Sequence, residues 1–139
     1  DWVTQVSFKP RLLAVAIEND ARTLENIRAT GWFSVNFLSQ DPAGMALAAK
    51  FAQPYYDAKV GGRGPAAVRV HHKLDNVPHT RTAHGCPVLE GALAWLECEV
   101  EQLIAVGDHT LVTGQVREAV RLRDGEPLTS TFTGWNYSG

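Results

Sequence analysis

Two long segments of alternating residues, joined by a tight turn, constrain the fold of this chain more than any other feature. Between residues 92 and 101, small or apolar side chains alternate with a series that includes Glu97, Glu99 and Glu101. A period of two is typical of a strand with one face in the core and one polar face. A turn is predicted at residues 107–108, and residues 109–122 continue as a second long strand. We therefore expect antiparallel pairing to dominate the second half of the chain.

The first half predicts three further strands. Residues 1–8 resemble a strand from the first position, so we expect the first strand of the fold to precede this sequence. The apolar run at residues 12–17 predicts a central strand buried on both faces. Residues 32–38 predict a strand with one large apolar face, which we expect in the core: Phe33, Val35 and Phe37. The other face presents Ser34 and Asn36, which suits the wall of a ligand pocket, although an ordinary half-buried strand explains the same pattern.

Two short helices are predicted between these strands. Thr23 is expected to be the N-cap of the first, and Gly31 can supply the left-handed residue that ends it. Asp41 and Pro42 predict a cap and a first-turn proline for the second, near residues 43–51.

The remaining segments predict loops and a closing hairpin. Residues 53–87 lack regular periodicity, apart from a short strand near residues 68–70, and such a long loop is usually functional or a covering flap. Asp124 and Gly125 predict a hairpin turn, with a returning strand at residues 128–132. The expected fold is therefore mainly β, with five or six strands in a closed or split β-barrel. A doubly wound parallel fold is excluded because the second half lacks βα alternation.

Composition narrows the classes of function. The 139 residues fit one domain, 1–139, and a net charge of −2 gives no basic surplus for nucleic acid or an anionic membrane. The sequence contains neither a membrane-spanning apolar run nor a signal-peptide pattern. Since Cys86 and Cys98 are the only cysteines, a secreted disulfide framework is not indicated, and we expect a cytoplasmic location.

Few side chains form a recognisable catalytic motif. The histidines and cysteines show neither C-x-x-C nor H-x-x-x-H spacing, so no metal site is predicted. Nucleophile-elbow, P-loop and dinucleotide-binding glycine motifs are also absent from the sequence. A thiolate at Cys86 activated by His84 is conceivable, whereas Cys98 on an apolar strand face should be inert. His109, directly after a turn, could reach over a barrel mouth to an aromatic ligand, although a surface histidine fits equally well.

Several short motifs follow one another in an order that adds to this interpretation. They occupy residues 2–10, 12–17, 30–39, 49–52, 85–98, 107–111, 114–116 and 134–137. In this order they resemble the flavin reductase-like family, whose members are FMN-binding split-barrel proteins.

The resemblance implies a Greek-key split barrel that forms a homodimer and binds FMN, or FAD, at or near the subunit interface. It also implies three groups of cofactor-binding residues: Trp2, Val3, Thr4 and Gln5; Asn36, Phe37, Leu38 and Ser39; Ala49, Lys50 and Phe51. Lys50 could meet the flavin phosphate as a point charge, and a solvated helix lysine is the competing interpretation. His109 resembles a histidine near the nicotinamide, and it is our candidate catalytic residue.

The activity implied by the resemblance is that of an NAD(P)H-dependent flavin reductase. Hydride would pass from the nicotinamide of NADH or NADPH to the flavin, and then to an acceptor or a partner monooxygenase. Two alternatives remain: an FMN-holding electron carrier without nicotinamide turnover, and a split-barrel flavin-dependent oxygenase.

Overall fold

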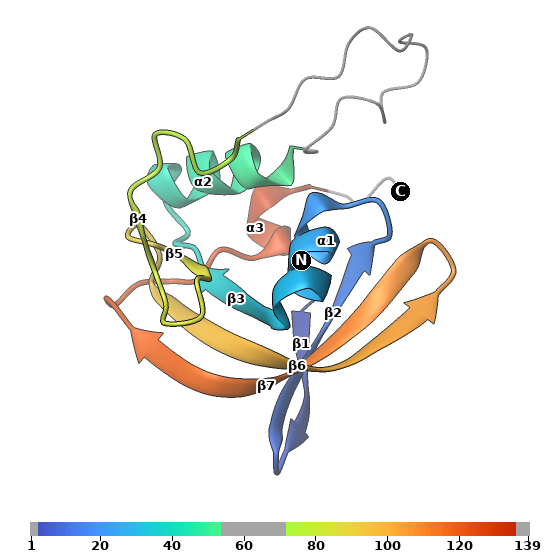
Figure 1. Ribbon diagram of the computed structural model, residues 1–139. Helices are drawn as coiled ribbons and strands as arrows, with labels where there is room; N and C mark the ends of the chain where they lie inside the picture. Colours follow the sequence, from blue (N-terminus) through green and yellow to red (C-terminus); the bar gives the residue numbers. More distant parts are fainter. Residues whose placement is uncertain (1–2, 54–71, 136–139) are drawn as a thin grey trace, which may run out of the picture.

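A computed structural model describes residues 3–53 and 72–135 and confirms a mainly β protein (Figure 1). Five antiparallel strands form the main sheet in the order β1-β2-β7-β6-β3, and β4 pairs with β5 in a separate hairpin. The strands are β1 (Val3–Phe8), β2 (Arg11–Glu18), β3 (Trp32–Phe37), β4 (His79–Arg81), β5 (Pro87–Leu89), β6 (Ala94–Val106) and β7 (His109–Arg121). The helices are α1 (Arg22–Thr30), α2 (Pro42–Ala52) and α3 (Ser130–Thr133). The strand expected near residues 68–70 lies outside the described residues.

The predicted long hairpin is present as β6 and β7. The strands pair antiparallel from Ala94 opposite Arg121 to Val106 opposite His109. The ladder contains two irregularities, because Arg117 of β7 and Glu101 of β6 each lack a residue directly opposite in the partner strand. Each strand therefore contains one extra residue, as in a β-bulge.

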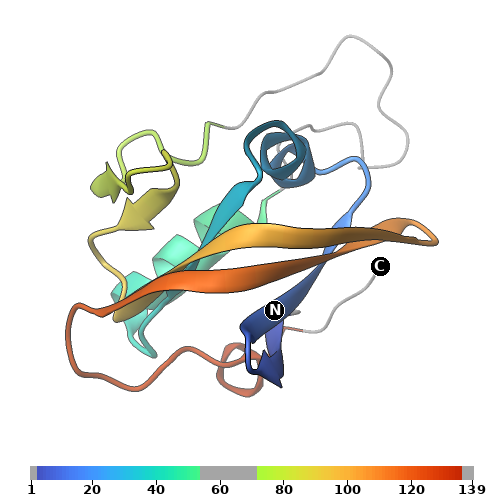
Figure 2. The same ribbon diagram turned by 60° about the horizontal axis from the view of Figure 1, so that its bottom comes forward.

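The main core lies between α1 and one face of the sheet. Leu24 and Ile27 of α1 are buried against side chains of four strands, which are Leu13, Phe33, Cys98 and Val112. Figure 2 shows α1 resting above the long β6–β7 pair. Cys98 is fully buried, and burial raises the pKa of its thiol to about 11, which confirms the expectation of an inert core cysteine.

The other face of β3 and β6 is covered by the β4–β5 hairpin. Ser34 Oγ donates a hydrogen bond to the carbonyl oxygen of Pro87 at 2.6 Å. Asn36 uses both ends of its amide, because Nδ2 donates to the Pro87 carbonyl at 3.2 Å and Oδ1 accepts from the Leu89 N–H at 2.9 Å. The two polar side chains therefore fasten β5 to β3.

This covering layer corrects one prediction from the alternating pattern. Glu97 stands directly opposite Ser34 in the β3–β6 ladder, so the two side chains share a face. The expected polar face is therefore buried at this point, and the Glu97 side chain is only 3% exposed. The sequence could not indicate this, because β4 and β5 are only three residues long each.

In the first half of the chain, the position of Phe37 and the start of α1 differ from the predictions, whereas the cap of α2 agrees with them. Phe37 was expected in the core with Phe33, but it lies at the end of β3, beyond the core cluster, and is 39% exposed. Helix α1 starts one residue before the expected N-cap Thr23, and its N-cap Ala21 makes no side-chain bond. The start of α2 is confirmed, since Asp41 Oδ1 accepts from the Gly44 N–H at 2.8 Å, and this bond lowers the pKa of Asp41.

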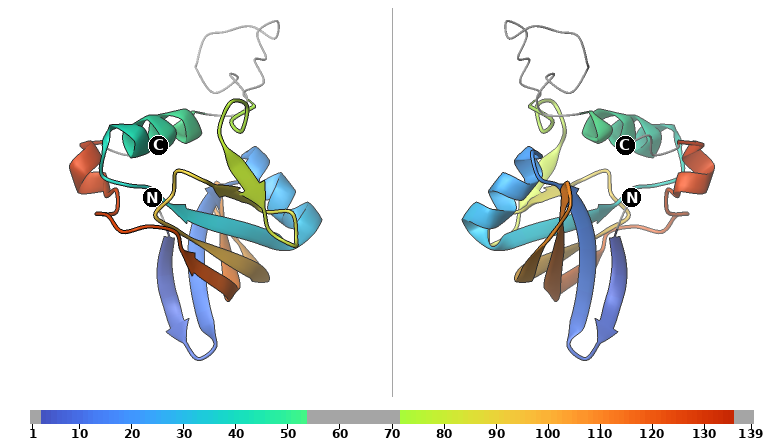
Figure 3. Two further views of the ribbon diagram at one scale, coloured as in Figure 1. Left: turned by 90° about the vertical axis from the view of Figure 1, so that its left-hand side faces the viewer. Right: turned by 90° about the vertical axis from the view of Figure 1, so that its right-hand side faces the viewer.

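The C-terminal segment also differs from the prediction. Residues 128–132 do not form a returning strand; instead Thr129 caps the short helix α3, which adds a third helix to the two expected. Pro127 lacks an N–H for a ladder, and the chain before α3 runs beside Ser39 in a single bridge. Figure 3 shows α3 near α2, with the β1–β2 hairpin projecting away from both.

Candidate functional site

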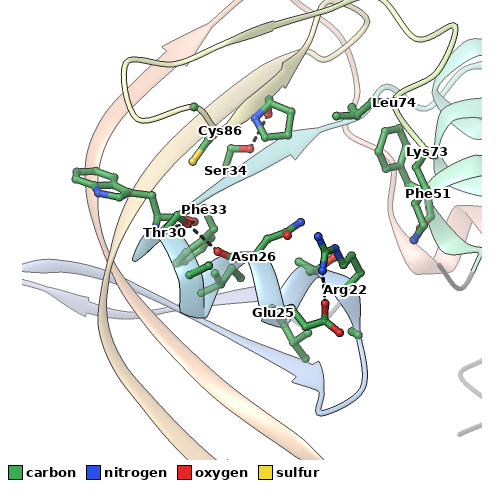
Figure 4. Close-up of a pocket in the computed structure, with 18 of the residues that line it drawn as sticks. Arg22, Glu25, Asn26, Thr30, Phe33, Ser34, Phe51, Lys73, Leu74 and Cys86 are labelled. Atoms are coloured by element: carbon green, nitrogen blue, oxygen red, sulfur yellow. Dashed lines mark hydrogen bonds and ion pairs between the residues drawn. The ribbon is translucent and has the colours of Figure 1, made fainter. Parts of the chain in front are cut away.

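A cleft of about 1360 Å³ lies between α1, the end of α2, the chain before β4 and the β4–β5 turn. Figure 4 shows Thr30 and Cys86 toward one end of the cleft, and Phe51, Lys73 and Leu74 toward the other. Ligand sites commonly occupy about 300–1,000 Å³, so the cleft has room for a cofactor-sized molecule.

Helix α1 supplies a polar wall. Because Leu24 and Ile27 point into the core, the neighbouring turns present Arg22, Glu25 and Asn26 to the cleft. Arg22 Nη1 forms an ion pair with Glu25 Oε2 at 2.5 Å. This wall therefore carries both signs of charge and an amide.

The end of α2 supplies an apolar wall with a cation beside it. Phe51 and Leu74 pack on a second buried cluster that contains Val77. Lys73 Nζ donates to the Phe51 carbonyl at 2.8 Å, and burial lowers the pKa of this lysine. An aromatic surface and a partly desolvated ammonium group thus lie side by side.

The opposite end of the cleft contains a histidine held by a buried carboxylate. His84 Nδ1 lies 3.0 Å from Glu97 Oε2, and the imidazole stacks on Trp32 with ring centroids 3.5 Å apart. His84 therefore bonds Glu97 rather than activating Cys86. Burial and the Glu97 carboxylate raise the pKa of the Cys86 thiol, which disfavours the conceivable thiolate nucleophile.

Among the residues expected from the resemblance, Phe51 lines this cleft. Its neighbour Lys50 donates to the carbonyl of Asp75 and does not line the cleft. Leu38 packs on the cluster that contains Val77, as Phe51 does. The Asn36 amide is occupied by β5, as described above. Trp2 lies outside the described residues.

The other expected residues occupy different places. The buried Ser39 accepts a hydrogen bond from Arg123 at 3.0 Å. Val3, Thr4 and Gln5 lie on β1, the sheet edge opposite to β3 in strand order. His109 stands opposite Glu18, which itself lines the cleft, and its Nδ1 lies 2.7 Å from Asp108 Oδ1. A single chain therefore brings the residues around Phe51 together and leaves those of β1 at another edge.

The sequence patterns did not indicate Arg22, Asn26, Lys73 or the His84–Glu97 pair. Only His84 had drawn attention in the sequence, as a neighbour of Cys86. Glu97 could not be connected with it, because its position beside the β4–β5 turn depends on the pairing of β6 with β3. Within residues 3–53 and 72–135, no group of three or more His, Cys, Asp and Glu side chains could hold a metal ion. The same part of the chain has no helix long and apolar enough to cross a membrane.

The donor set of the cleft fits a flavin nucleotide. Phe51 and Leu74 offer an apolar surface for a ring system, while Arg22 and Lys73 offer cationic groups for a phosphate. The fit rests on these side chains together with the size of the cleft.

Comparison with known proteins identifies relatives that are named for flavin chemistry. The NADH-dependent flavin reductase of Rhodococcus sp is 35% identical over 125 residues, which cover 90% of this chain and 60% of that protein. The reductase subunit of a flavin-dependent monooxygenase from Rhodococcus jostii is 27% identical over 123 residues, covering 88% of this chain and 54% of that protein.

A solved structure and a family model extend the comparison. The NADH:FAD oxidoreductase of Streptomyces globisporus superposes with a TM-score of 0.68 at 28% identity, covering 87% of this chain and 64% of that one. This chain thus spans less than two thirds of the length of each of these three proteins. The model of the flavin reductase like domain matches residues 1–135. The chain therefore belongs to the flavin reductase-like domain family.

Proposed function

We propose that this protein is an NAD(P)H-dependent flavin reductase that binds FMN or FAD in the cleft between α1 and α2. The observation that carries the proposal is the combination of an apolar wall at Phe51 with cationic groups at Arg22 and Lys73 in one cleft. The similarity to an NADH-dependent flavin reductase and to an NADH:FAD oxidoreductase supports the nicotinamide nucleotide as the reductant.

The residues of the cleft would bind and orient rather than exchange protons. Phe51 and Leu74 would cover the flavin ring from water, Lys73 would neutralise the phosphate, and Arg22 would bind it in exchange for its ion pair with Glu25. When bound, the flavin accepts hydride from the nicotinamide and passes the electrons on. The expected roles of His109 and of the backbone at residues 36–39 remain part of this proposal. Val3, Thr4 and Gln5 lie at another edge of the sheet, so in this proposal they would contact the flavin that the other subunit of a dimer holds.

We further propose that the protein acts as a homodimer and supplies electrons to a partner monooxygenase. Exposed apolar side chains on β1 and at the β6–β7 turn, such as Phe8 and Val106, support association. The similarity to a monooxygenase reductase subunit supports the partner. The two free cysteine thiols are in keeping with the expected cytoplasmic location.

The test is reduction of bound flavin under anaerobic conditions. We expect the purified protein to bind FMN or FAD and the visible absorbance of the flavin to fall after NADH or NADPH is added. Phe51→Ala should weaken flavin binding about tenfold, since an aromatic contact is lost. Phe132→Ala, which removes an exposed ring of α3 outside the cleft, is the matched control.

Two results would contradict the proposal. A protein that takes up neither flavin would not be a flavoprotein. Bound flavin that neither nucleotide reduces would point to the electron carrier instead.

A further inference from the structure

The stacked pair Trp32 and His84 lines the end of the cleft that the proposed flavin contacts leave unused. Its rings are almost parallel, with an angle of 6° between their planes and centroids 3.5 Å apart. Both residues line the cleft, and the His84 side chain is 43% exposed. Trp32 begins β3, whereas His84 belongs to the turn between β4 and β5, so two elements far apart in sequence build one stacked pair, in which each ring covers one face of the other.

Glu97 holds this pair in one orientation. Burial acts to raise the pKa of Glu97, but hydrogen bonds with Thr82 and His84 outweigh burial, and the pKa lies below its usual value. The side chain is therefore ionised near neutral pH, and an ionised carboxylate only accepts hydrogen bonds. His84 Nδ1 must then carry the proton that is shared with Oε2 across 3.0 Å.

The assembly of Glu97, His84 and Trp32 includes a buried carboxylate, which packing of the β4–β5 turn alone would not require. Glu97 Oε1 is buried without a hydrogen bond from the described residues, so the assembly keeps a costly group in place. What this maintains is the outer face of the His84 ring at the cleft, backed by Trp32, with Arg81 also lining the cleft. Such a surface suits a planar nitrogen heterocycle linked to a phosphate.

The size of the cleft leaves room for this second group. Its volume of about 1360 Å³ exceeds the range of about 300–1,000 Å³ common for ligand sites. Phe51 and Lys73 lie toward one end, and Thr30, whose hydroxyl accepts a hydrogen bond from the backbone N–H of Trp32, lies toward the other (Figure 4). A dinucleotide has two halves, each a ring system linked to a phosphate, which match the two ends of the cleft.

We propose that the Trp32–His84 stack, oriented by Glu97, binds the adenosine monophosphate half of a dinucleotide. This half occurs both in FAD and in NADH or NADPH, and the inference rests on the proposed function only in assuming that one of these enters the cleft. The base would stack on the outer face of the exposed His84 ring, which Trp32 supports from the other side, so His84 is the contact residue and Trp32 and Glu97 are positioning residues.

The experiment compares each dinucleotide with its mononucleotide. Calorimetry gives the dissociation constants of FAD, FMN and AMP, and steady-state kinetics give KM for NADH and for reduced nicotinamide mononucleotide. Trp32→Ala and His84→Ala should weaken binding of AMP and of one dinucleotide about tenfold, while binding of its mononucleotide changes less than twofold. Trp32→Phe, which keeps an aromatic ring, should retain most of the affinity.

Glu97→Gln separates positioning from folding. It should raise KM or the dissociation constant for the affected dinucleotide and leave kcat unchanged. His79→Ala is the matched control, because His79 lies on β4, is bonded to Val77, and does not line the cleft. Circular dichroism checks that each variant is folded.

The outcomes identify the source of the adenosine half. Selective loss with FAD assigns the surface to the flavin, and selective loss with NADH assigns it to the nicotinamide nucleotide. Equal loss with mononucleotides and dinucleotides, or no loss in folded variants, would overturn the inference. If the wild-type protein bound no flavin and oxidised no NADH, the proposed function would fail, while AMP binding that is lost in Trp32→Ala would still support this surface.

Discussion

Glu97 couples the stability of the protein to pH. Its pKa is lower in the folded protein than the usual value, so the carboxylate stabilises the fold above the unfolded-state pKa. This stabilisation is lost as the pH falls through the folded-state value, because the protonated side chain no longer accepts the same hydrogen bonds.

Glu97→Gln should therefore destabilise the protein more at neutral pH than in acid. We expect a loss of about 1–3 kcal/mol in the free energy of unfolding at pH 7, and a smaller loss near pH 3. Urea unfolding across this range measures both. Glu99→Gln is the control, because Glu99 is exposed and its ion pair with Arg117 should contribute at most about 1 kcal/mol. A loss that is the same at every pH would show that the charge of Glu97 is irrelevant.

Among the elements, the first turn of α2 approaches the end of β3 more closely than a side chain permits. A Cβ atom at Gly44 would overlap the carbonyl oxygen of Ser39, which is backbone and cannot rotate away. Ser39 is in turn held by the Arg123 side chain, so this contact is fixed from both sides.

Gly44→Ala should accordingly cost about 3 kcal/mol or more. Thermal or urea unfolding provides the measurement. Gly91→Ala is the control, since its Cβ would meet only the end of the Leu47 side chain at 3.0 Å, and we expect a loss below about 1 kcal/mol. Equal losses in both variants would mean that α2 can shift away from β3.

The elements also show which parts of the fold could be predicted. The β6–β7 hairpin and the Asp41 cap followed from period-two alternation and local capping chemistry. The β4–β5 hairpin and α3 did not, because segments of three or four residues leave no periodic signal. The burial of Glu97 was missed for the same reason, since it depends on what covers the strand.

For the whole molecule, the exposed apolar side chains predict association. Phe8, at the end of β1, is 82% exposed, and Val106, at the β6–β7 turn, is 54% exposed. We expect a dimer in analytical ultracentrifugation, and Phe8→Lys should shift the equilibrium toward the monomer at least tenfold, because it places a charge on the apolar surface. Lys9→Ser, at the neighbouring position, should leave the dimer unchanged. A wild-type protein that stays monomeric at high concentration would contradict the proposed homodimer.

The candidate site could be predicted only in part, for a reason that belongs to the whole molecule. Phe51 was identified through its family motif and does line the cleft. Arg22, Lys73 and His84 were not, because their meeting depends on how α1, the chain before β4 and the β4–β5 turn are placed around the sheet. Local sequence patterns carry no information on such long-range placement.

The two irregularities of the β6–β7 ladder have a consequence for how the length of this chain can vary. The extra residues Arg117 and Glu101 stand on opposite strands, so the offset introduced by one is cancelled by the other. Because neither extra residue has a partner, loss of either one leaves every paired residue with its own partner and makes the ladder regular at that point. Loss of a paired residue would instead slip the pairing of everything beyond it and turn inward-facing side chains toward solvent. Deletions within these strands should therefore be tolerated at Arg117 or Glu101 and not at the paired positions around them.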